Sequence, residues 1–512
     1  MITSSLRRRA LATLAGGAVA FATTVAVTPT ASAAPTASGH AAGTWLAAQL
    51  TDGVIHNDQW DYDDLGLTLD VLGALQAVEV QPATQTTILD TVTARVAEYV
   101  EYTDGGVTTF YPGSAGKLLV AVDAAGRDVR SVGGRDLVAQ IEAVTDDTTG
   151  ESAETYGLFG QTFATRGLIA GASDEAAASV GFVADQQCPA GSFKQVLTAA
   201  CSDVPEIDTT VAALTTLLEA RAAGIAVEQT VIDRAVAALV AAQAADGSFV
   251  GNGVPNSNST GLAAVVLQRA GRTTEAARAA AWVGRHQVTE ATGGKLSAEA
   301  GAIAYDGAAR TEGIEYGIEP ETRDQWIRAT AQAAPALALG AQARAAVSAA
   351  TYVRSGTTLK VTASGLPAGW SSSARVAGGT SARTVVPAAG RAVFTLRVPR
   401  GTAKRTITVS DRTGRTVASR SVQVLAAKKL RVTSPGKVRR GAKQKVVVRG
   451  LVSREPVRVY YRGKLVKRGV ASAKGTYTYR VKVGRKTGKA KVVVRGAYAD
   501  RQGARTFRVV KK

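Results

Sequence analysis

The heptapeptide Gln243-Ala-Ala-Asp-Gly247-Ser-Phe249 recurs twice earlier in the chain, as Gln49-Leu-Thr-Asp-Gly53-Val-Ile55 and Gln187-Cys-Pro-Ala-Gly191-Ser-Phe193. The shared pattern is glutamine, three residues, glycine, one residue and a large apolar residue. Degenerate copies follow Tyr102, Val144 and Gln287, and five steps between Gln49 and Gln287 average about 48 residues. Recurrence at such an interval is typical of stacked structural repeats, each long enough for two helices and two connections.

Helical periodicity surrounds the best copy of the pattern. Residues 234–243 carry alanine and leucine on one side, which predicts an amphipathic helix that ends at Asp246 and Gly247. After a polar loop, residues 261–267 are apolar on every side, which predicts a buried helix. Each repeat is therefore predicted to pair an outer amphipathic helix with an inner buried one.

Six such pairs are predicted between residues 34 and 345. Outer helix then inner helix, they are 41–50 with 65–77, 84–101 with 114–125, 134–144 with 154–170, 174–187 with 208–223, 228–243 with 258–270, and 273–287 with 322–340. Six pairs can close into a double-walled barrel, an α/α toroid. Neither end has the atypical polar repeat that caps an open solenoid, so closure is favoured over an open rod, which stays the alternative.

The Gln-x-x-x-Gly-x-aromatic pattern resembles the repeat of the terpenoid cyclase and protein prenyltransferase superfamily of α/α toroids. The resemblance covers about residues 40–342, with Phe or Ile where that family often has Trp. It implies that the glutamine ties an outer helix to the following turn. The residues to which it gives this structural role are Gln49, Gly53, Gln187, Gly191, Phe193, Gln243, Gly247 and Phe249.

The outer-to-inner connections would all emerge at one end of such a toroid. They are the most polar segments of the chain, and a concave mouth rich in aromatics and carboxylates is a natural binding site. The predicted ligand-binding residues are Trp60, Tyr62, Tyr111, Glu154, Tyr156, Asp208, Tyr305 and Tyr316.

Asp61, Asp63 and Asp64 have three interpretations. Asp61-Tyr62-Asp63-Asp64 resembles the Asp-x-Asp-Asp motif of protonating terpenoid cyclases, where a carboxylic acid starts cyclisation. Asp61 and Asp63, together with Glu154 and Asp208, could instead serve as general acid and base of a glycan hydrolase or lyase. Asp63 and Asp64 could also simply cap the following helix.

For the mouth of the toroid as a whole, we expect ligand binding without turnover. Export and an aromatic content of 5% argue against cyclisation, so a glycan-active enzyme precedes a terpene cyclase among the catalytic alternatives. Three histidines and two cysteines do not compose a zinc site, and no EF-hand spacing is present. The sequence therefore predicts no metal and no cofactor.

The N-terminus predicts export. Residues 1–33 combine Arg7 to Arg9, an apolar stretch over 10–27 and the small-residue site Ala31-Ser32-Ala33, as in a secretory signal peptide. In an oxidising compartment, Cys188 and Cys201 are expected to form a disulfide. The predicted location is extracellular or associated with the cell wall.

The composition changes at about residue 347, where alternating apolar and polar residues replace helical periodicity. Two β-sandwiches are predicted, over 347–426 and 428–512, and they look like the immunoglobulin-like modules appended to exported bacterial proteins. Residues 428–512 hold 28 Lys and Arg against two acidic residues, a balance of +26. We expect this domain to bind anionic cell-wall polymers or lipid headgroups; nucleic acid is not expected outside the cell.

Overall fold

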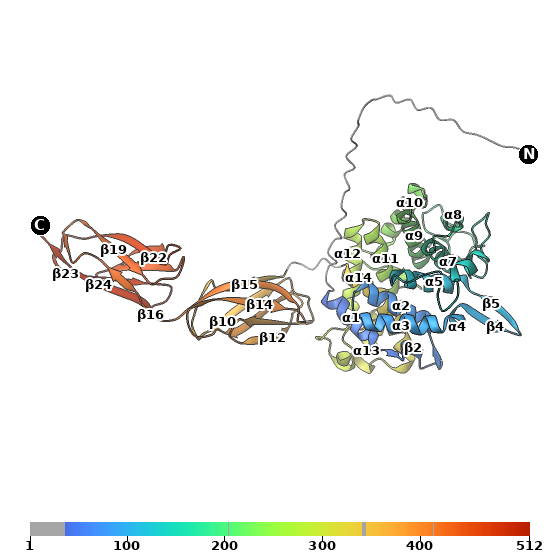
Figure 1. Cartoon of the computed structure of the whole chain (residues 1–512), viewed down its shortest axis with the longest axis horizontal. Helices are drawn as coiled ribbons and strands as arrows, with labels where there is room; N and C mark the ends of the chain where they lie inside the picture. Colours follow the sequence, from blue (N-terminus) through green and yellow to red (C-terminus); the bar gives the residue numbers. More distant parts are fainter. Residues whose placement is uncertain (1–35, 203, 340–344, 413, 512) are drawn as a thin grey trace, which may run out of the picture. The chain divides into compact units, whose positions relative to one another are not determined.

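The computed structural model describes residues 36–202, 204–339, 345–412 and 414–511. The predicted signal peptide over 1–33 lies outside these ranges. Within them, no helix combines the length and the apolar character that crossing a membrane requires. Helices occupy the part up to residue 339 and strands the part after residue 345, as predicted (Figure 1).

Six helices of the N-terminal region are predominantly buried, and each follows an outer-to-inner connection. They are α2 (Leu65–Ala77), α5 (Pro112–Ala124), α7 (Leu158–Ala170), α9 (Ile207–Ala222), α11 (Ser257–Arg269) and α14 (Pro320–Ala338). They contact one another in the order α2, α5, α7, α9, α11 and α14, and α14 also contacts α2; Figure 1 labels all six. Their buried residues recur at three- and four-residue intervals and contribute to one apolar core.

Most of the helices that precede these six are more exposed, although the first, over Ala37–Ala47, is mostly buried. They are α1 (Ala37–Ala47), α3 (Pro82–Ala94) with α4 (Val96–Val100), α6 (Leu137–Glu142), α8 (Ala176–Asp185), α10 (Gln229–Ala242) and α12 (Thr273–His286). The predicted outer helix 84–101 is broken at Arg95, whose side chain pairs with Glu98 and Asp63. The predicted helix 134–144 begins only after Asp136, because that carboxylate accepts a hydrogen bond from the Ala139 N–H and caps the helix there.

The last connection contains helices that the sequence analysis did not predict. A 3-10 helix spans Gly294–Ala298, and α13 spans Gly307–Tyr316. Asp306 caps α13 by accepting from the Ala309 N–H, and Gly317 ends it with a φ of 95°. Aspartate before and glycine after a ten-residue helix were therefore readable start and stop signals.

The repeated glutamines tie each turn to the next outer helix. Gln187 Nε2 donates to the carbonyls of Gly191 (3.0 Å) and Val231 in α10 (2.8 Å). Gln243 Nε2 donates likewise to Gly247 (3.2 Å) and to Glu275 in α12 (2.9 Å).

Two further glutamines show how far this tie extends. Gln287 Nε2 donates to the carbonyls of Gly301 and Ser38, so the tie also runs from the end of α12 to α1. Gln49 differs from the role implied for it, because its Nε2 donates to the carbonyl of Trp45 in the preceding helix α1 and its Oε1 accepts from Arg323. The disulfide between Cys188 and Cys201 is present, as predicted.

Residues after 345 form two pairs of sheets. In the first pair, one sheet has the order β13 (Arg391–Arg397), β10 (Thr358–Ser364), β8 (Ala346–Ser348). The other has the order β12 (Ser381–Val385), β11 (Ser371–Val376), β14 (Ala403–Ser410), β15 (Thr416–Leu425), β9 (Tyr352–Arg354). Alternate residues such as Val361, Phe394 and Ile407 are buried in a shared apolar core.

The second pair of sheets has its own core. The larger sheet has the order β16 (Lys428–Lys429), β24 (Arg501–Val510), β23 (Gly488–Arg495), β20 (Pro456–Tyr461), β21 (Lys464–Val470), with β18 (Lys437–Arg439) also paired to β24. The smaller has the order β17 (Arg431–Thr433), β19 (Lys443–Arg449), β22 (Thr476–Lys482). Glu455 and Arg501 are both fully buried beside this core and form an ion pair.

Candidate functional site

Three of the connections that lead into the inner helices are β-hairpins rather than irregular loops. β2 (Val54–Asn57) and β3 (Tyr62–Asp63) precede α2, with β1 (Leu50–Thr51) paired to β2. β4 (Glu101–Asp104) and β5 (Val107–Phe110) precede α5, and β6 (Val250–Gly251) and β7 (Val254–Pro255) precede α11. The acidic motif lies at the tip and end of the first hairpin.

Asp61 and Asp63 differ in environment although they are two residues apart. The Asp61 side chain is 98% exposed, and its nearest charged partner is His56 at 3.4 Å. Asp63 accepts from His56 Nδ1 at 3.0 Å and from Arg95 Nη1 at 2.6 Å. Hydrogen bonds from His56 and then Arg95 lower the pKa of Asp63, whereas the bond to Asp63 raises the pKa of His56. A proton donor needs a raised carboxyl pKa, so the pKa of Asp63 moves in the opposite direction.

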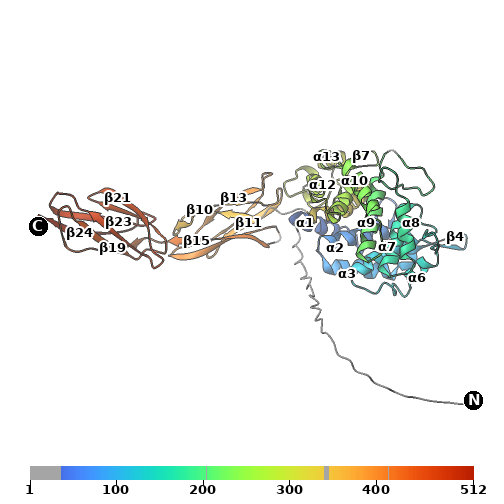
Figure 2. The same ribbon diagram turned by 90° about the horizontal axis from the view of Figure 1, so that it is seen from above.

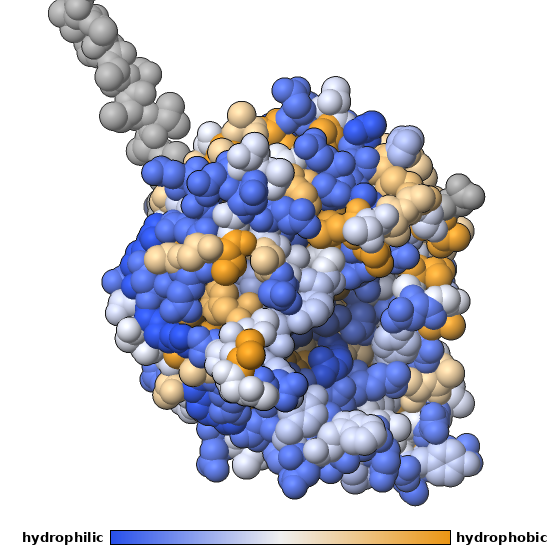
Figure 3. Space-filling model, turned by 90° about the vertical axis from the view of Figure 1, so that its right-hand side faces the viewer, coloured by the Kyte–Doolittle hydropathy of each residue, from blue (hydrophilic) through white to orange (hydrophobic). Residues whose placement is uncertain are grey.

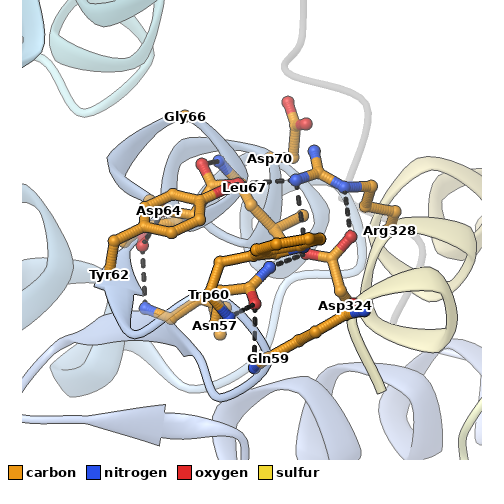
Figure 4. Close-up of polar contacts among 12 residues, drawn as sticks. Asn57, Gln59, Trp60, Tyr62, Asp64, Gly66, Leu67, Asp70, Asp324 and Arg328 are labelled. Carbon is orange, nitrogen blue, oxygen red and sulfur yellow. Dashed lines mark hydrogen bonds and ion pairs between the residues drawn. The ribbon is translucent and has the colours of Figure 1, made fainter. Parts of the chain in front are cut away.

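Asp64 is the N-cap of α2. Its Oδ1 accepts from the Leu67 N–H at 2.7 Å, and its Oδ2 accepts from Arg328 Nη2 at 2.5 Å. Arg328, on α14, also pairs with Asp324 at 2.7 Å. Figure 4 shows Asp64, Asp324 and Arg328 pointing toward one another, so both carboxylates face a cation.

Contacts join only some of the predicted ligand-binding residues to one another. Tyr111 and Tyr156 lie with ring centroids 5.8 Å apart, and Glu154 and Tyr156 line one open pocket of about 670 Å³. Trp60 and Tyr62 stand on the first hairpin, where Trp60 is 69% exposed. Tyr316 ends α13 and Tyr305 precedes it.

Asp208, at the start of α9, is the most buried of the predicted ligand-binding carboxylates. Burial raises the pKa of its carboxyl, and the neighbouring Ser259 hydroxyl opposes that shift only partly. Apart from this contact with Ser259, Asp208 Oδ1 has no hydrogen-bond partner among the described residues, and Asn258 Oδ1 has none either. Buried acceptors of this kind favour a ligand or water that donates hydrogen bonds.

Side chains that, apart from Asp64, the sequence analysis did not single out join neighbouring inner helices. Each pair of side chains forms a tie between one inner helix and an adjacent inner helix. The ties are Asp70–Lys117 between α2 and α5, Arg166–Glu219 between α7 and α9, Glu219–Arg269 between α9 and α11, Asn258–Gln332 between α11 and α14, and Asp64–Arg328 between α2 and α14. The signal in the sequence was a charged or amide side chain within, or at the start of, a helix that is largely buried.

The Phe163 ring of α7 lies between two of these cations. Lys117 Nζ is 5.8 Å and the Arg166 guanidinium 5.5 Å from its centroid. Burial acts to lower the pKa of Lys117, but Asp70 and other acidic neighbours outweigh it and the net pKa is raised. Lys117 therefore remains charged between α2 and α5.

Figure 3 shows one face of the helical region, with a hollow bordered mainly by hydrophilic side chains.

No protein-family model matches this chain, and no curated protein matches it. Among solved structures, a protein from Actinoplanes is 13% identical over 59% of this chain and 98% of its own, with a TM-score of 0.42. The ent-copalyl diphosphate synthase from Streptomyces platensis is 19% identical over 54% of this chain and 50% of its own, with a TM-score of 0.37.

The strand-rich part of the chain also resembles a solved structure. The Yersinia pseudotuberculosis adhesin InvE is 14% identical over 32% of this chain, with a TM-score of 0.18. This chain spans 58% of the length of that adhesin. Similarities this weak assign no activity.

Replacing Asp64 by alanine is expected to lower the free energy of unfolding of the helical region by about 1–2 kcal/mol. The variant loses the cap of α2 and one partner of Arg328, which keeps Asp324. Urea unfolding followed by tryptophan fluorescence measures the change. Asp61→Ala is the matched control and should change stability little, because Asp61 is almost fully exposed. Equal losses in both variants would contradict the capping role.

Proposed function

We propose that this protein is exported and binds a ligand or polymer at the hairpin end of a closed α/α toroid, while its cationic C-terminal domain attaches it to anionic polymers of the cell envelope. One observation carries the binding proposal. Two acidic residues of the predicted mouth, Asp63 and Asp64, are engaged by arginines, whereas aromatic side chains such as Trp60 and Tyr156 are exposed.

Closure of the toroid is supported by contacts between the first and last repeats. α14 contacts α2, Arg328 pairs with Asp64, and Gln287 donates to the carbonyl of Ser38 in α1. These ties use the same elements that join the internal repeats. The first and sixth helix pairs are therefore neighbours, which an open rod would not allow.

Binding without turnover is favoured over glycan cleavage. A glycosidase needs one carboxyl kept protonated and a second left free to act as nucleophile or base across the substrate. Burial raises the pKa of Asp208, as an acid would require, but Asp63 and Asp64 each face an arginine, so neither is left free as the second carboxylate. Exposed tyrosine and tryptophan rings, and buried acceptors without a partner among the described residues, suit a ligand that offers apolar faces and hydrogen-bond donors.

Attachment by the C-terminal domain follows from its charge. Residues 428–512 carry a balance of +26, which exceeds what solubility requires. The disulfide is compatible with an oxidising compartment, where wall polymers and headgroups are the abundant anions.

Sedimentation of the purified protein (residues 34–512) with isolated cell envelopes tests both parts of the proposal. We expect the protein in the pellet at 50 mM NaCl and at least about tenfold less bound at 500 mM NaCl, because salt screens charge contacts. Mass spectrometry of the supernatant should detect no glycan fragments.

Two outcomes of that experiment would contradict the proposal. Equal binding at both salt concentrations would show that charge does not hold the protein to the envelope. Fragments released by the unaltered protein, but not by a variant with Asp61, Asp63 and Asp64 changed to asparagine, would make the protein an enzyme.

A further inference from the structure

The outer face of the larger C-terminal sheet presents a row of polar side chains on five adjacent strands. The register places Gln502 of β24 between Lys429 of β16 and Arg495 of β23, and Arg458 of β20 between Arg495 and Arg468 of β21. We call the set Lys429, Gln502, Arg495, Arg458 and Arg468 the cationic row. Neighbouring strands lie about 4.8 Å apart, so the row spans roughly 19 Å. Figure 2 labels β21, β23 and β24 of this sheet.

The row places like charges directly opposite one another. Arg458 faces Arg495 on one side and Arg468 on the other, and a second line on the same face pairs Lys437 and Lys489 with Arg508. Like charges at opposed positions destabilise a sheet. An anion lying along the row would remove this repulsion.

Acidic side chains do not neutralise the row. Residues 428–512 contain two acids, Glu455 and Asp500. Glu455 is buried and held by Arg501. Asp500 lies in a groove at the β16 end of the row, where it is outnumbered by the cations that share the groove lining.

That groove is a second feature of the surface, and it shares Lys429, Arg495 and Gln502 with the row. It has a volume of about 670 Å³ and is lined in part by Lys428, Lys429, Lys491 and Arg495. The Arg495 guanidinium lies 4.9 Å from the Tyr460 ring centroid, and its Nε has no hydrogen-bond partner among the described residues. The ring therefore positions the guanidinium, whose buried Nε is not used by another described residue.

We propose that the cationic row and its groove bind a flexible linear polymer that carries its charge on phosphate groups. The proposal rests on the attachment part of the proposed function and specifies the surface and the chemistry of the partner. Guanidinium forks match phosphate oxygens bidentately, and lysines add point charges beside them. The row holds three arginines on adjacent strands, so consecutive phosphates can be bound along it.

A polymer fits the charge distribution better than a bilayer does. The smaller sheet also opposes like cations, with Lys443 facing Lys482, Lys445 facing Arg480 and Arg431 facing Arg449. A planar membrane can contact the outer face of one sheet at a time, whereas a flexible chain can pass over both. The distribution of cations over both faces therefore favours the polymer.

Single-stranded nucleic acid is disfavoured by the aromatic residues of this domain. Proteins that bind single strands stack bases on exposed aromatic rings beside the cationic groove. Within described residues 428–511, every Tyr and Phe side chain is buried or half-buried. The surface can therefore bind phosphates but offers no exposed aromatic ring on which bases could stack.

The test compares two triple variants of residues 34–512 in binding fluorescent inorganic polyphosphate. The row variant combines Arg458→Gln, Arg468→Gln and Arg495→Gln. The control combines Lys360→Gln, Arg391→Gln and Arg397→Gln, which removes the same charge from β10 and β13, where each cation faces an uncharged residue. At equal ionic strength we expect the row variant to bind at least about 30-fold more weakly, and the control within about threefold of the unaltered protein.

Thermal unfolding verifies that both triple variants are folded. The row variant should melt no earlier than the unaltered protein, because it loses like-charge repulsion. Equal losses in the two triple variants would overturn the proposal by showing that charge acts diffusely. Equally tight binding of polyglutamate would overturn the phosphate assignment, and binding of phosphatidylglycerol vesicles without binding of polyphosphate would replace the polymer by a membrane.

Envelope sedimentation separates the two levels of inference. If the row variant still sediments with envelopes in a salt-dependent way and to the same extent as the unaltered protein, the proposed surface is wrong while attachment by charge stands. If the unaltered protein fails to sediment but binds polyphosphate through the row, the proposed attachment is wrong and the binding surface stands.

Discussion

Replacing Glu455 by glutamine is expected to lower the free energy of unfolding of the C-terminal domain by about 3–5 kcal/mol, because it leaves a buried cation without its counter-charge. Arg501 Nε and Nη2 donate to the two carboxylate oxygens at 2.7 and 2.8 Å, and both side chains are fully buried. The carboxylate also accepts from the backbone N–H groups of Val452 and Ala497. Hydrogen exchange of β20, β23 and β24 amides measures the effect.

The expected loss depends on pH. Burial acts to raise the pKa of Glu455, but hydrogen bonds from Arg501 and the backbone outweigh it, and the net pKa is lowered. A lowered carboxyl pKa stabilises the fold above the unfolded value, about 4.3, and this stabilisation disappears as the pH falls through the folded pKa. The difference between the unaltered protein and Glu455→Gln should therefore be full at pH 7 and shrink below about pH 4.

A double variant distinguishes the lost ion pair from a general packing defect. Glu455→Leu combined with Arg501→Met removes both charges and keeps apolar volume, so it should cost less than Glu455→Gln alone. Removal of an exposed charge, as in Lys474→Gln, should leave exchange unchanged. A loss below about 1 kcal/mol in Glu455→Gln would contradict the role assigned to the buried pair.

Replacing Gly116 by alanine is expected to destabilise the helical region by about 3 kcal/mol through overpacking. Gly116 lies on α5 at its closest approach to α7, where an added Cβ would sit 2.0 Å from the Phe163 carbonyl oxygen and 2.4 Å from its carbonyl carbon. Because these are backbone atoms, the two helices must separate to admit the methyl group. Urea unfolding followed by tryptophan fluorescence measures the change.

Gly73 of α2 is the matched control and should respond in the opposite direction. A Cβ at Gly73 meets no atom within 4 Å, so alanine there adds helix propensity without a clash. Gly73→Ala should stabilise the helical region by about 0.5–1 kcal/mol. Two glycine-to-alanine changes of the same sign would show that helix propensity, rather than the contact between α5 and α7, controls the response.

Features of the site that depend on distant neighbours could not be predicted. The carboxylates of Asp61, Asp63 and Asp64 are adjacent in sequence, but their partners are not: Arg95 lies 32 residues from Asp63, and Arg328 lies 264 residues from Asp64. Periodicity placed Arg328 near the start of a helix and could not say which side chain that helix would meet. A cluster of three acids was therefore visible in the sequence, whereas their engagement by cations was not.

By itself the sequence determined the properties that depend on near neighbours. Helical or strand periodicity, the turn residues of each repeat, the disulfide between Cys188 and Cys201 and the charge of residues 428–512 were all predictable, because each depends on residue order or composition over short stretches. Only the tertiary structure decided that α14 meets α2 and that Arg458 faces Arg495 and Arg468. The physical reason is that a shift of one residue in strand register turns every side chain to the other face, so the alignment of strands distant in sequence decides which charges meet.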